Sequence, residues 1–483
     1  MAPESAPDRR RGAVIAVCVG GALTALDLTI VVVALPTVDA ELGGGLGALQ
    51  WVVTGYTLAF ASLILTAGAL SDRTGDRPVF ATGVALFTAA SAACGLAPTV
   101  PLLIAARVLQ GMGAAAILAT SIALLARTYS GTARATAIAA WVTVGTLAAN
   151  LGPLVGGLLV DALGWRAIFL VNVPIGVLLL IALPALIAPP TVTDGPRRPL
   201  DVGGLVLAVV ALFALNTALL TGPELGWATP LVLGAGAVAV LALVAFGLHQ
   251  SLRRERALID LRLFRIPTFS GAVLLSLLSR IASFGALPFF VLWLQGPVGL
   301  SATATGMAML AMSLPVLLLS FVGARLQRMV PARTLIAVGN LAGVAAGLAL
   351  LFGITPDSGW TAAVPGFVLI GVSAGLVFPS LMGLAVGVVS PERAGLASGV
   401  ANTFFPLGTA IGVAVFGVVL AAAADRAGLV GPARDATLAG TGDPAALVAG
   451  LDGIAACMGA LSALGVLVAV ALVRERDRLP IPH

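Results

Sequence analysis

A single carboxylate inside the first apolar stretch is the most unusual chemical group in this sequence. Asp27 lies in the middle of the run over residues 13–35, whereas the other acidic residues fall between such runs or at their ends. A charge at the centre of a bilayer costs roughly 2.5–3.5 kcal/mol on insertion scales. Burial opposes the charged form and a nearby cation favours it, so a carboxyl balanced between the two can bind and release a proton. We predict that Asp27 carries protons; the alternative is a permanently paired Asp that only stabilises the bundle.

A buried cation is the natural partner of this carboxylate. Arg107 lies within a later apolar run, and Gln110 follows it on the same helical face. Because an arginine stays charged, its side chain must face protein or water. We predict that Arg107 pairs with Asp27, directly or through water, and helps to control its protonation. A static counter-ion, or an arginine whose charged end reaches the membrane surface, is the alternative.

Helices in a membrane must position these groups. Of the 483 residues, 59% are hydrophobic and 10% are charged, whereas a soluble domain is about 25% charged. The apolar runs are about 20 residues long, which is the length of a membrane-spanning helix. Barrel strands would show alternating polarity instead. We predict an all-α polytopic membrane protein with about fourteen spans, in contact with the lipid bilayer. The net charge of +5 lies mostly in short loops, so we expect no nucleic-acid partner.

The order of the spans indicates two bundles with an insertion. Most of the 26 basic residues lie on one side if the N-terminus is cytoplasmic, so we predict that both termini are cytoplasmic. Gly68 with Arg73, and Gly323 with Arg328, form a faint repeat. Such halves place a substrate site at their interface. We divide the chain into a six-helix bundle (1–188), a cytoplasmic linker (189–201), two inserted helices (202–250), a basic amphipathic segment (251–268) and a second six-helix bundle (269–483).

A charged hairpin joins the second and third spans. Its notable residues are Gly68, Asp72, Arg73, Gly75 and Arg77. The glycine at position 75 permits a tight turn, and the charges can pair with neighbouring helix ends. We predict that this loop holds one conformation of a rocking bundle; the alternative is a solvated loop.

The fifth span combines glycines with a proline. Gly152, Gly156 and Gly157 surround Pro153. Small residues permit close contact between helices in a membrane, and a proline inside a helix bends it. We predict a close and bent helix contact here, unless this is ordinary small-residue packing.

Several segments in order resemble the major facilitator superfamily, and specifically its 14-helix drug/proton antiporter family. They are LDLTIVVVALP (26–36), WVVTGYTLAFA (51–61), GALSDRTGDR (68–77), RVLQGMGAA (107–115), NLGPLVGG (150–157), GWRAIFLVNVPIG (164–176) and NTFFPLGTAIGVAV (402–415). The resemblance covers nearly the whole chain. It implies that the segment at 107–115 takes part in proton transfer and the segment at 150–157 in antiport.

The sequence also departs from this family. Asp76 replaces a basic residue of the loop, which we expect to weaken the grip of the loop on the other half. Phe405 and Pro406 replace a polar pair, which makes the cavity more apolar. Family members that expel dications tend to carry an acidic residue in the membrane helices of the second half, and we identify none there. We therefore expect neutral, monocationic or partly anionic substrates.

Candidate cavity residues come from both halves. Arg280 is the ionisable group in the spans of the second half, and it binds an acidic group of a substrate or pairs with a carbonyl at a helix break near Pro288. The full set of candidates is Tyr56, Gln110, Trp141, Asn150, Arg280 and Phe284.

We predict a proton-coupled antiporter that exports small lipophilic drugs or antibiotics across the bacterial cytoplasmic membrane by alternating access. It would act as a monomer, driven by the proton gradient with no cofactor. No catalytic motif, Walker loop or metal-ligand spacing is present in the sequence, so we predict neither an enzyme nor a metal site. A dedicated exporter or importer of one metabolite, and a non-transporting sensor, are the alternatives.

Overall fold

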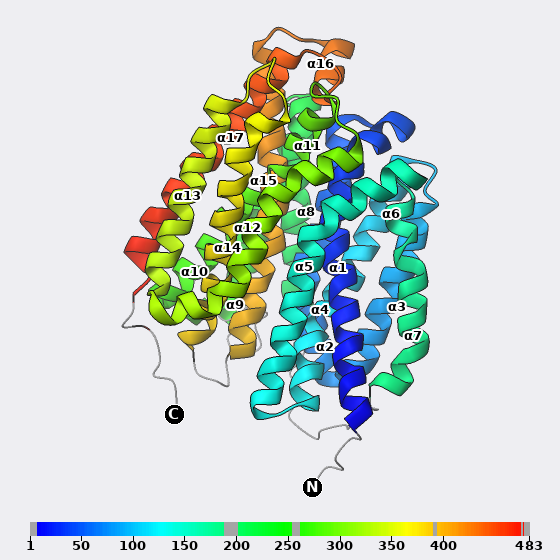
Figure 1. The fold of residues 1–483 in the computed structure, drawn as a ribbon, viewed down its shortest axis with the longest axis vertical. Helices are drawn as coiled ribbons and strands as arrows, with labels where there is room; N and C mark the ends of the chain where they lie inside the picture. Colours follow the sequence, from blue (N-terminus) through cyan, green and yellow to red (C-terminus); the bar gives the residue numbers. More distant parts are fainter. Residues whose placement is uncertain (1–6, 188–200, 254–260, 390–393, 475–476, 478–483) are drawn as a thin grey trace.

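The protein is a bundle of long helices that cross the molecule from one end to the other (Figure 1). The computed structural model describes residues 7–187, 201–253, 261–389, 394–474 and 477. Within these ranges there is no strand. They contain 14 helical segments long and apolar enough to cross a membrane. The all-α, fourteen-span prediction is confirmed.

The first six spans form one group of packed helices. They are α1 (Pro7–Leu42), α2 (Gly45–Thr74), α3 (Asp76–Gly95), α4 (Val100–Thr128), α5 (Gly131–Leu163) and the short α6 (Ala167–Leu170) continued by α7 (Asn172–Leu186). Within this group α4 lies between α2 and α3, and α5 packs along α1.

Along the chain, two further helices lie between this group and the second one. They are α8 (Val202–Leu225) and α9 (Pro230–Arg253). The ring of Phe213 on α8 stacks on Trp51 of α2 with centroids 6.0 Å apart, and Asn216 donates to the Thr54 hydroxyl at 3.0 Å. Asp201 caps α8 and contacts His249 Nε2 of α9 at 2.7 Å. Most of the predicted linker and residues 254–260 of the predicted amphipathic segment lie outside the described residues, and the division into domains stays a prediction.

The last six spans form the second group. They comprise the 3₁₀ turn η2 (Leu261–Arg265), α10 (Pro267–Phe284), α11 (Leu287–Gln295), α12 (Ala302–Met329), α13 (Ala332–Gly353), η3 (Trp360–Ala363), α14 (Val364–Gly387), α15 (Ala394–Arg426), α16 (Gly431–Leu438) and α17 (Pro444–Leu472). The ninth span breaks between α10 and α11, where Pro288 at the start of α11 has no N–H to continue the helix.

The apolar run over residues 453–473 predicts the last span, but the helix begins nine residues earlier, at Pro444. Asp443 caps α17 by accepting from the amide of Ala445 at 2.9 Å, and Pro444 follows in the first turn. Asp452 consequently lies inside a membrane-spanning helix. The expectation that the membrane helices of the second half carry no acidic residue was wrong, and so was the argument against dicationic substrates that rested on it.

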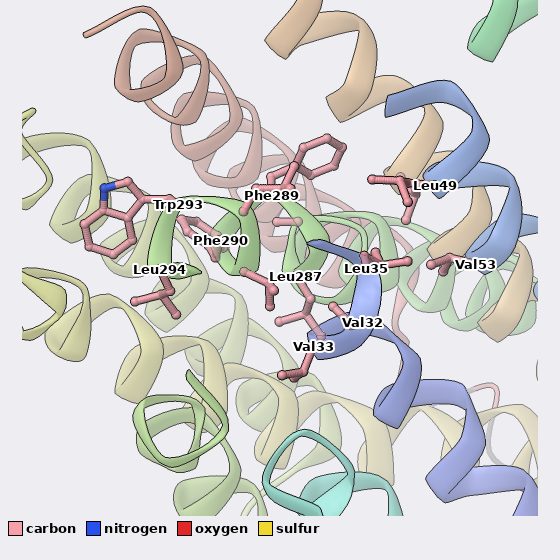
Figure 2. Close-up of a cluster of buried hydrophobic side chains, with 14 of the residues drawn as sticks. Val32, Val33, Leu35, Leu49, Val53, Leu287, Phe289, Phe290, Trp293 and Leu294 are labelled. Carbon is pink, nitrogen blue, oxygen red and sulfur yellow. The ribbon is translucent and has the colours of Figure 1, made fainter. Parts of the chain in front are cut away.

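Among the described residues, one buried apolar cluster joins the two groups, and it lies at one end of the molecule. We call the end with both termini the terminal end and the opposite end, with α16, the distal end (Figure 1). One buried cluster at the distal end joins both groups, and Figure 2 shows its centre. It includes Val32, Val33 and Leu35 of α1, Leu49 and Val53 of α2, and Leu287, Phe289, Phe290, Trp293 and Leu294 of α11.

Towards the terminal end, each group has a cluster of its own. One includes Val17, Phe80 and Ile117 from the first group. The other includes Phe269 and Leu381 from the second group. The helices therefore pack as two bundles that are joined at the distal end and separate towards the terminal end.

Candidate functional site

Asp27 is the centre of a buried polar network inside the first bundle. One carboxylate oxygen accepts a hydrogen bond from Arg107 Nη1 and forms an ion pair with it. The other accepts from Gln110 Nε2 at 2.8 Å and from Asn172 Nδ2 at 3.1 Å. Ser91 Oγ accepts from the same two amides, at 2.7 and 3.3 Å. The predicted pairing of Asp27 with Arg107 is direct, and it is confirmed.

Arg107 is held from several sides, which fixes the direction of its guanidinium. Its Nε donates to the carbonyl of Val52 at 3.0 Å, and Nη1 also donates to Gln110 Oε1 at 2.7 Å. The guanidinium lies 4.3 Å from the centroid of the Tyr56 ring. Arg107 Nη2 is buried and makes no hydrogen bond with the described residues.

This network is sealed from solvent on all sides. Asp27, Ser91, Arg107 and Gln110 are fully buried, and Asn172 is 1% exposed. Every hydrogen bond to the carboxylate oxygens of Asp27 comes from an N–H donor, so the arrangement fits the ionised carboxylate. A buried charge with its partners complete is stable, but loss of one partner leaves the other charge uncompensated.

Two members of the network were not singled out from the sequence. Ser91 comes from α3 and Asn172 from α7, so four helices, α1, α3, α4 and α7, contribute to the network. In the sequence, each of these two residues is marked only as an isolated polar residue within an apolar span. That signal also marks Ser and Thr residues that bond their own helix, as Ser121 does with the carbonyl of Ile117, so it is weak.

The other predicted cavity residues do not all join this site. Tyr56 is buried beside it and donates to the carbonyl of Thr24 at 3.2 Å. Trp141 is partly buried against Gly21, where an added Cβ would lie 2.6 Å from the indole nitrogen. Asn150 is partly buried and donates to the Thr146 carbonyl of its own helix at 2.8 Å. The structure thus brings Tyr56 and Gln110 to Asp27, and leaves Trp141 and Asn150 along α5.

The glycines of α5 permit two close helix contacts. A Cβ at Gly152 would lie 1.9 Å from Thr29 Oγ1 of α1, and one at Gly156 would lie 2.8 Å from the carbonyl of Ile30. A Cβ at Gly157 would lie 2.3 Å from the carbonyl of Ala302 on α12. The predicted close contact of this helix is therefore confirmed, and it joins α5 to both bundles.

Pro153 takes part in the second of these contacts. Its carbonyl lies against Gly306 of α12, where an added Cβ would be 2.4 Å away. At Gly145, nearer the start of α5, an added Cβ would instead meet open space. The tight part of α5 is thus confined to its distal half.

The loop between α2 and α3 is organised around Asp76. This side chain is buried, accepts a hydrogen bond from Ser71, and forms an ion pair at 2.7 Å with Arg127 of α4. We expected Asp76 to weaken contact with the other bundle. Asp76 opens α3, where the helix dipole favours an acid, and it binds within its own bundle. The weaker contact with the other bundle stays a prediction.

The remaining residues of this loop differ in backbone conformation and in exposure. Gly75 has φ +94°, a conformation that favours glycine. Arg73 is exposed, Arg77 is partly buried, and a Cβ at Gly68 would meet open space. The side chains of Asp72 and Phe405 lie outside the described residues.

Arg280 lies in the second bundle, far from this network in the chain. It is on α10 and is 5% exposed. Its guanidinium carbon is 3.9 Å from the centroid of Phe284 and 4.3 Å from that of Phe378. The predicted helix break is present one turn further on, at Gly285 and Ala286.

Two bundles of membrane-spanning helices that are joined at one end, with a buried ion pair inside the first bundle, define a membrane transporter and not an enzyme. The chain belongs to the Major Facilitator Superfamily, whose sequence profile matches residues 17–413 and 272–480. The resemblance drawn from the sequence motifs is confirmed.

Similar proteins include resistance and export proteins. The chain is 36% identical over 411 residues to the methylenomycin A resistance protein of Streptomyces coelicolor, which covers 85% of this chain and 86% of that protein. It is 34% identical over 410 residues to the tetracenomycin C resistance and export protein of Streptomyces glaucescens, covering 84% of this chain and 75% of that protein.

A solved structure shares the fold. A bacterial homologue of the human lysosomal transporter Spinster, in an inward-facing and unoccupied conformation, superposes with a TM-score of 0.67 at 18% identity. The match covers 99% of this chain and 100% of that chain. At this identity the likeness shows the fold alone.

Proposed function

We propose that this protein exports small lipophilic antibiotics or drugs across the bacterial cytoplasmic membrane in exchange for protons, acting as a monomer. The printed functions of its relatives, resistance and export, support the class of substrate and the direction. The observation that carries the exchange is the buried ion pair between Asp27 and Arg107.

The conformation supports alternating access. If the loops rich in arginine are cytoplasmic, the terminal end faces the cytoplasm and the distal end faces outward. The bundles are joined at the distal end and separate towards the terminal end. This arrangement corresponds to a state that is open to the cytoplasm and closed to the outside.

The charged form of Asp27 belongs to this state. Its oxygens receive N–H donors from Arg107, Gln110 and Asn172, which stabilise a carboxylate that has released its proton. After substrate leaves on the outside, a proton from that side neutralises Asp27 and weakens its attraction to Arg107. The protonated bundle then returns to the inward-open state, where Arg107 and the two amides favour release of the proton.

The proton gradient is sufficient for this work. One proton that moves with a potential of 100 mV releases about 2.3 kcal/mol. A tenfold concentration ratio of a neutral compound costs about 1.4 kcal/mol. Exchange of one proton for one neutral molecule can therefore sustain a gradient of more than tenfold.

The first test compares wild type with Asp27→Asn in a bacterial host that lacks its own efflux pumps. Accumulation of a panel of lipophilic dyes and antibiotics is followed with and without an uncoupler, at equal expression. Asp425→Asn serves as the control, because Asp425 is an exposed carboxylate that pairs with Arg434. We expect wild type and the control to lower accumulation, and the uncoupler and Asp27→Asn to restore it.

Export by Asp27→Asn at the wild-type rate would mean that the carboxylate is structural and would refute the proton exchange. Export of one panel member only, by wild type, would favour a dedicated exporter. Movement of the panel into the cell would reverse the proposed direction.

A further inference from the structure

Arg280 is a buried cation that the proton exchange does not use. It lies near the middle of the ninth span, Pro267–Gln295, as Asp27 lies near the middle of the first span. Each of these spans opens one of the two bundles. The structure therefore places an acidic group at mid-membrane in the first bundle and a basic group at the corresponding place in the second.

Two phenyl rings hold the guanidinium of Arg280. Phe284 lies one turn along α10, and Phe378 reaches it from α14. The two rings also contact each other, with centroids 6.0 Å apart. Ring faces attract a cation and remove water from it. They orient the planar guanidinium.

The position of these rings places Arg280 where the bundles separate. Phe284 packs at the edge of the distal cluster that joins both bundles, whereas Phe378 packs at the edge of the second bundle's own cluster. Both rings are partly exposed, although Arg280 itself is buried. A ligand that contacts these rings therefore lies beside the guanidinium.

The backbone beside Arg280 is adapted to its presence. Gly408 of α15 lies against it, and a Cβ there would be 2.7 Å from the Cβ of Arg280. Gly285, which follows in the break of the span, lies equally close to Gly412 of α15. Two glycines of α15 thus let α10 approach closely at the level of the arginine.

We propose that Arg280, held by Phe284 and Phe378, binds the carboxylate of an acidic lipophilic substrate. This proposal rests on the export function proposed above and assigns it a substrate class. The planar fork of a guanidinium matches a carboxylate in two parallel hydrogen bonds. The attraction is stronger between the bundles than in water, because fewer water molecules screen it. The rings also offer apolar contact to the remainder of the molecule.

The net charge moved in each transport cycle distinguishes acidic substrates from neutral and cationic ones. Export of a monoanion in exchange for one proton moves two positive charges inward in net terms, and the membrane potential drives each of them. Export of a neutral molecule moves one such charge, and export of a monocation moves none. Export of an acid should therefore respond most steeply to the membrane potential.

The test uses dansylglycine and its primary amide, which differ only in the charged group. Binding is measured on the purified full-length protein by the fluorescence of the dansyl group. We expect wild type to bind the acid roughly tenfold to hundredfold more tightly than the amide. Arg280→Gln should bring the two affinities within about twofold by weakening only the acid. Arg280→Lys should give an intermediate preference, because it keeps the charge and loses the planar fork.

A control variant and a competition experiment test whether the preference for the acid comes from Arg280. Arg333→Gln removes an exposed arginine of the same bundle, which donates to the carbonyl of Val470, and should leave both affinities unchanged. If Arg280→Gln does not fold, benzoate and benzamide are used as competitors on wild type. Benzoate should displace dansylglycine, and benzamide should not.

The outcomes keep this proposal apart from the proposed export function. Equal binding of acid and amide by wild type, or equal losses of both in Arg280→Gln, would overturn the acid site. Export of neutral compounds in the uncoupler assay would still stand in that case. Conversely, Arg280-dependent binding of dansylglycine without any proton-driven export would support the site and refute the export function.

Discussion

At the scale of single residues, the chemistry of this transporter depends on how Asp27 is surrounded. An isolated carboxylate in a membrane is costly, and here three N–H donors from two other helices, α4 and α7, offset that cost. Arg107 contributes the only formal charge among those donors. The pair is therefore stable while both charges are present, and it becomes unstable when either is removed alone.

This difference between the complete pair and a single remaining charge predicts the stability of variants at Asp27 and Arg107. Arg107→Met should destabilise the protein by about 3–5 kcal/mol, because Asp27 stays buried without its cation. The double variant Asp27→Asn with Arg107→Met should recover part of that loss. Apparent melting temperatures in detergent measure both effects. A double variant no more stable than Arg107→Met would show that the two side chains are not coupled.

The matched control is an ion pair at the surface. Arg166 pairs with Glu41, and both side chains are partly exposed. Arg166→Met should change the free energy of unfolding by only about 0–1 kcal/mol, since water replaces the lost partner. A loss as large as that of Arg107→Met would mean that burial is not what distinguishes the two pairs.

At the scale of elements, α5 determines how closely the bundles meet. Its distal half touches α1 through Gly152 and α12 through Gly157, at distances that leave no room for a methyl group. Its other half has open space at Gly145. The contact between α5 and α12 must loosen when the bundles open at the distal end. This contact is therefore present only in states in which the distal end is closed.

The expected effect of Gly157→Ala follows from this contact. The added methyl group would meet the carbonyl of Ala302, so the variant should favour states that are open at the distal end. Gly145→Ala is the control in the same helix and should have no effect. Spin labels at Leu163→Cys and Val430→Cys report the opening as a longer distance, with Cys18, Cys94 and Cys457 replaced by alanine. An unchanged distance in Gly157→Ala would show that α12 adapts without opening.

At the scale of the whole molecule, three polar contacts fasten the distal end. Asp161 at the end of α5 accepts from the amides of Ala302 and Thr303, at 3.2 and 2.8 Å. Gln295 donates to the carbonyl of Val33 at 2.8 Å. Gln50 of α2 donates to the carbonyl of Val413 at 3.1 Å. Each joins one bundle to the other, next to the apolar cluster of Figure 2.

Removal of the charged contact should shift the balance of conformations. Asp161→Ala should favour opening of the distal end by roughly tenfold, the value of a hydrogen bond to a charged group. The same spin-label pair measures the shift. Asp357→Ala is the control, because Asp357 is an exposed acid in the loop after α13. Equal distance distributions for Asp161→Ala and wild type would assign the closure to the apolar cluster alone.

The sequence by itself determined the membrane helices, because an apolar run of about 20 residues has no stable alternative in lipid. It also determined the family, through motifs such as those at 107–115 and 150–157. The pairing of Asp27 with Arg107 was predictable for a similar reason, since two opposite charges in one bundle have few other partners. These are properties that depend on residue type and order along the chain.

Only the tertiary structure decided which groups meet across helices. Asn172 and Ser91 complete the network of Asp27 because α4 and α7 pack against α1 and α3 packs against α4 and α7. No local pattern encodes this relation. The place of Asp452 inside α17 depended on a cap and a proline that extend the helix beyond its most apolar part. The rings around Arg280 meet because α14 crosses α10 at that level. Helix type and length follow from the solvent that surrounds the chain, whereas these contacts follow from packing among distant segments.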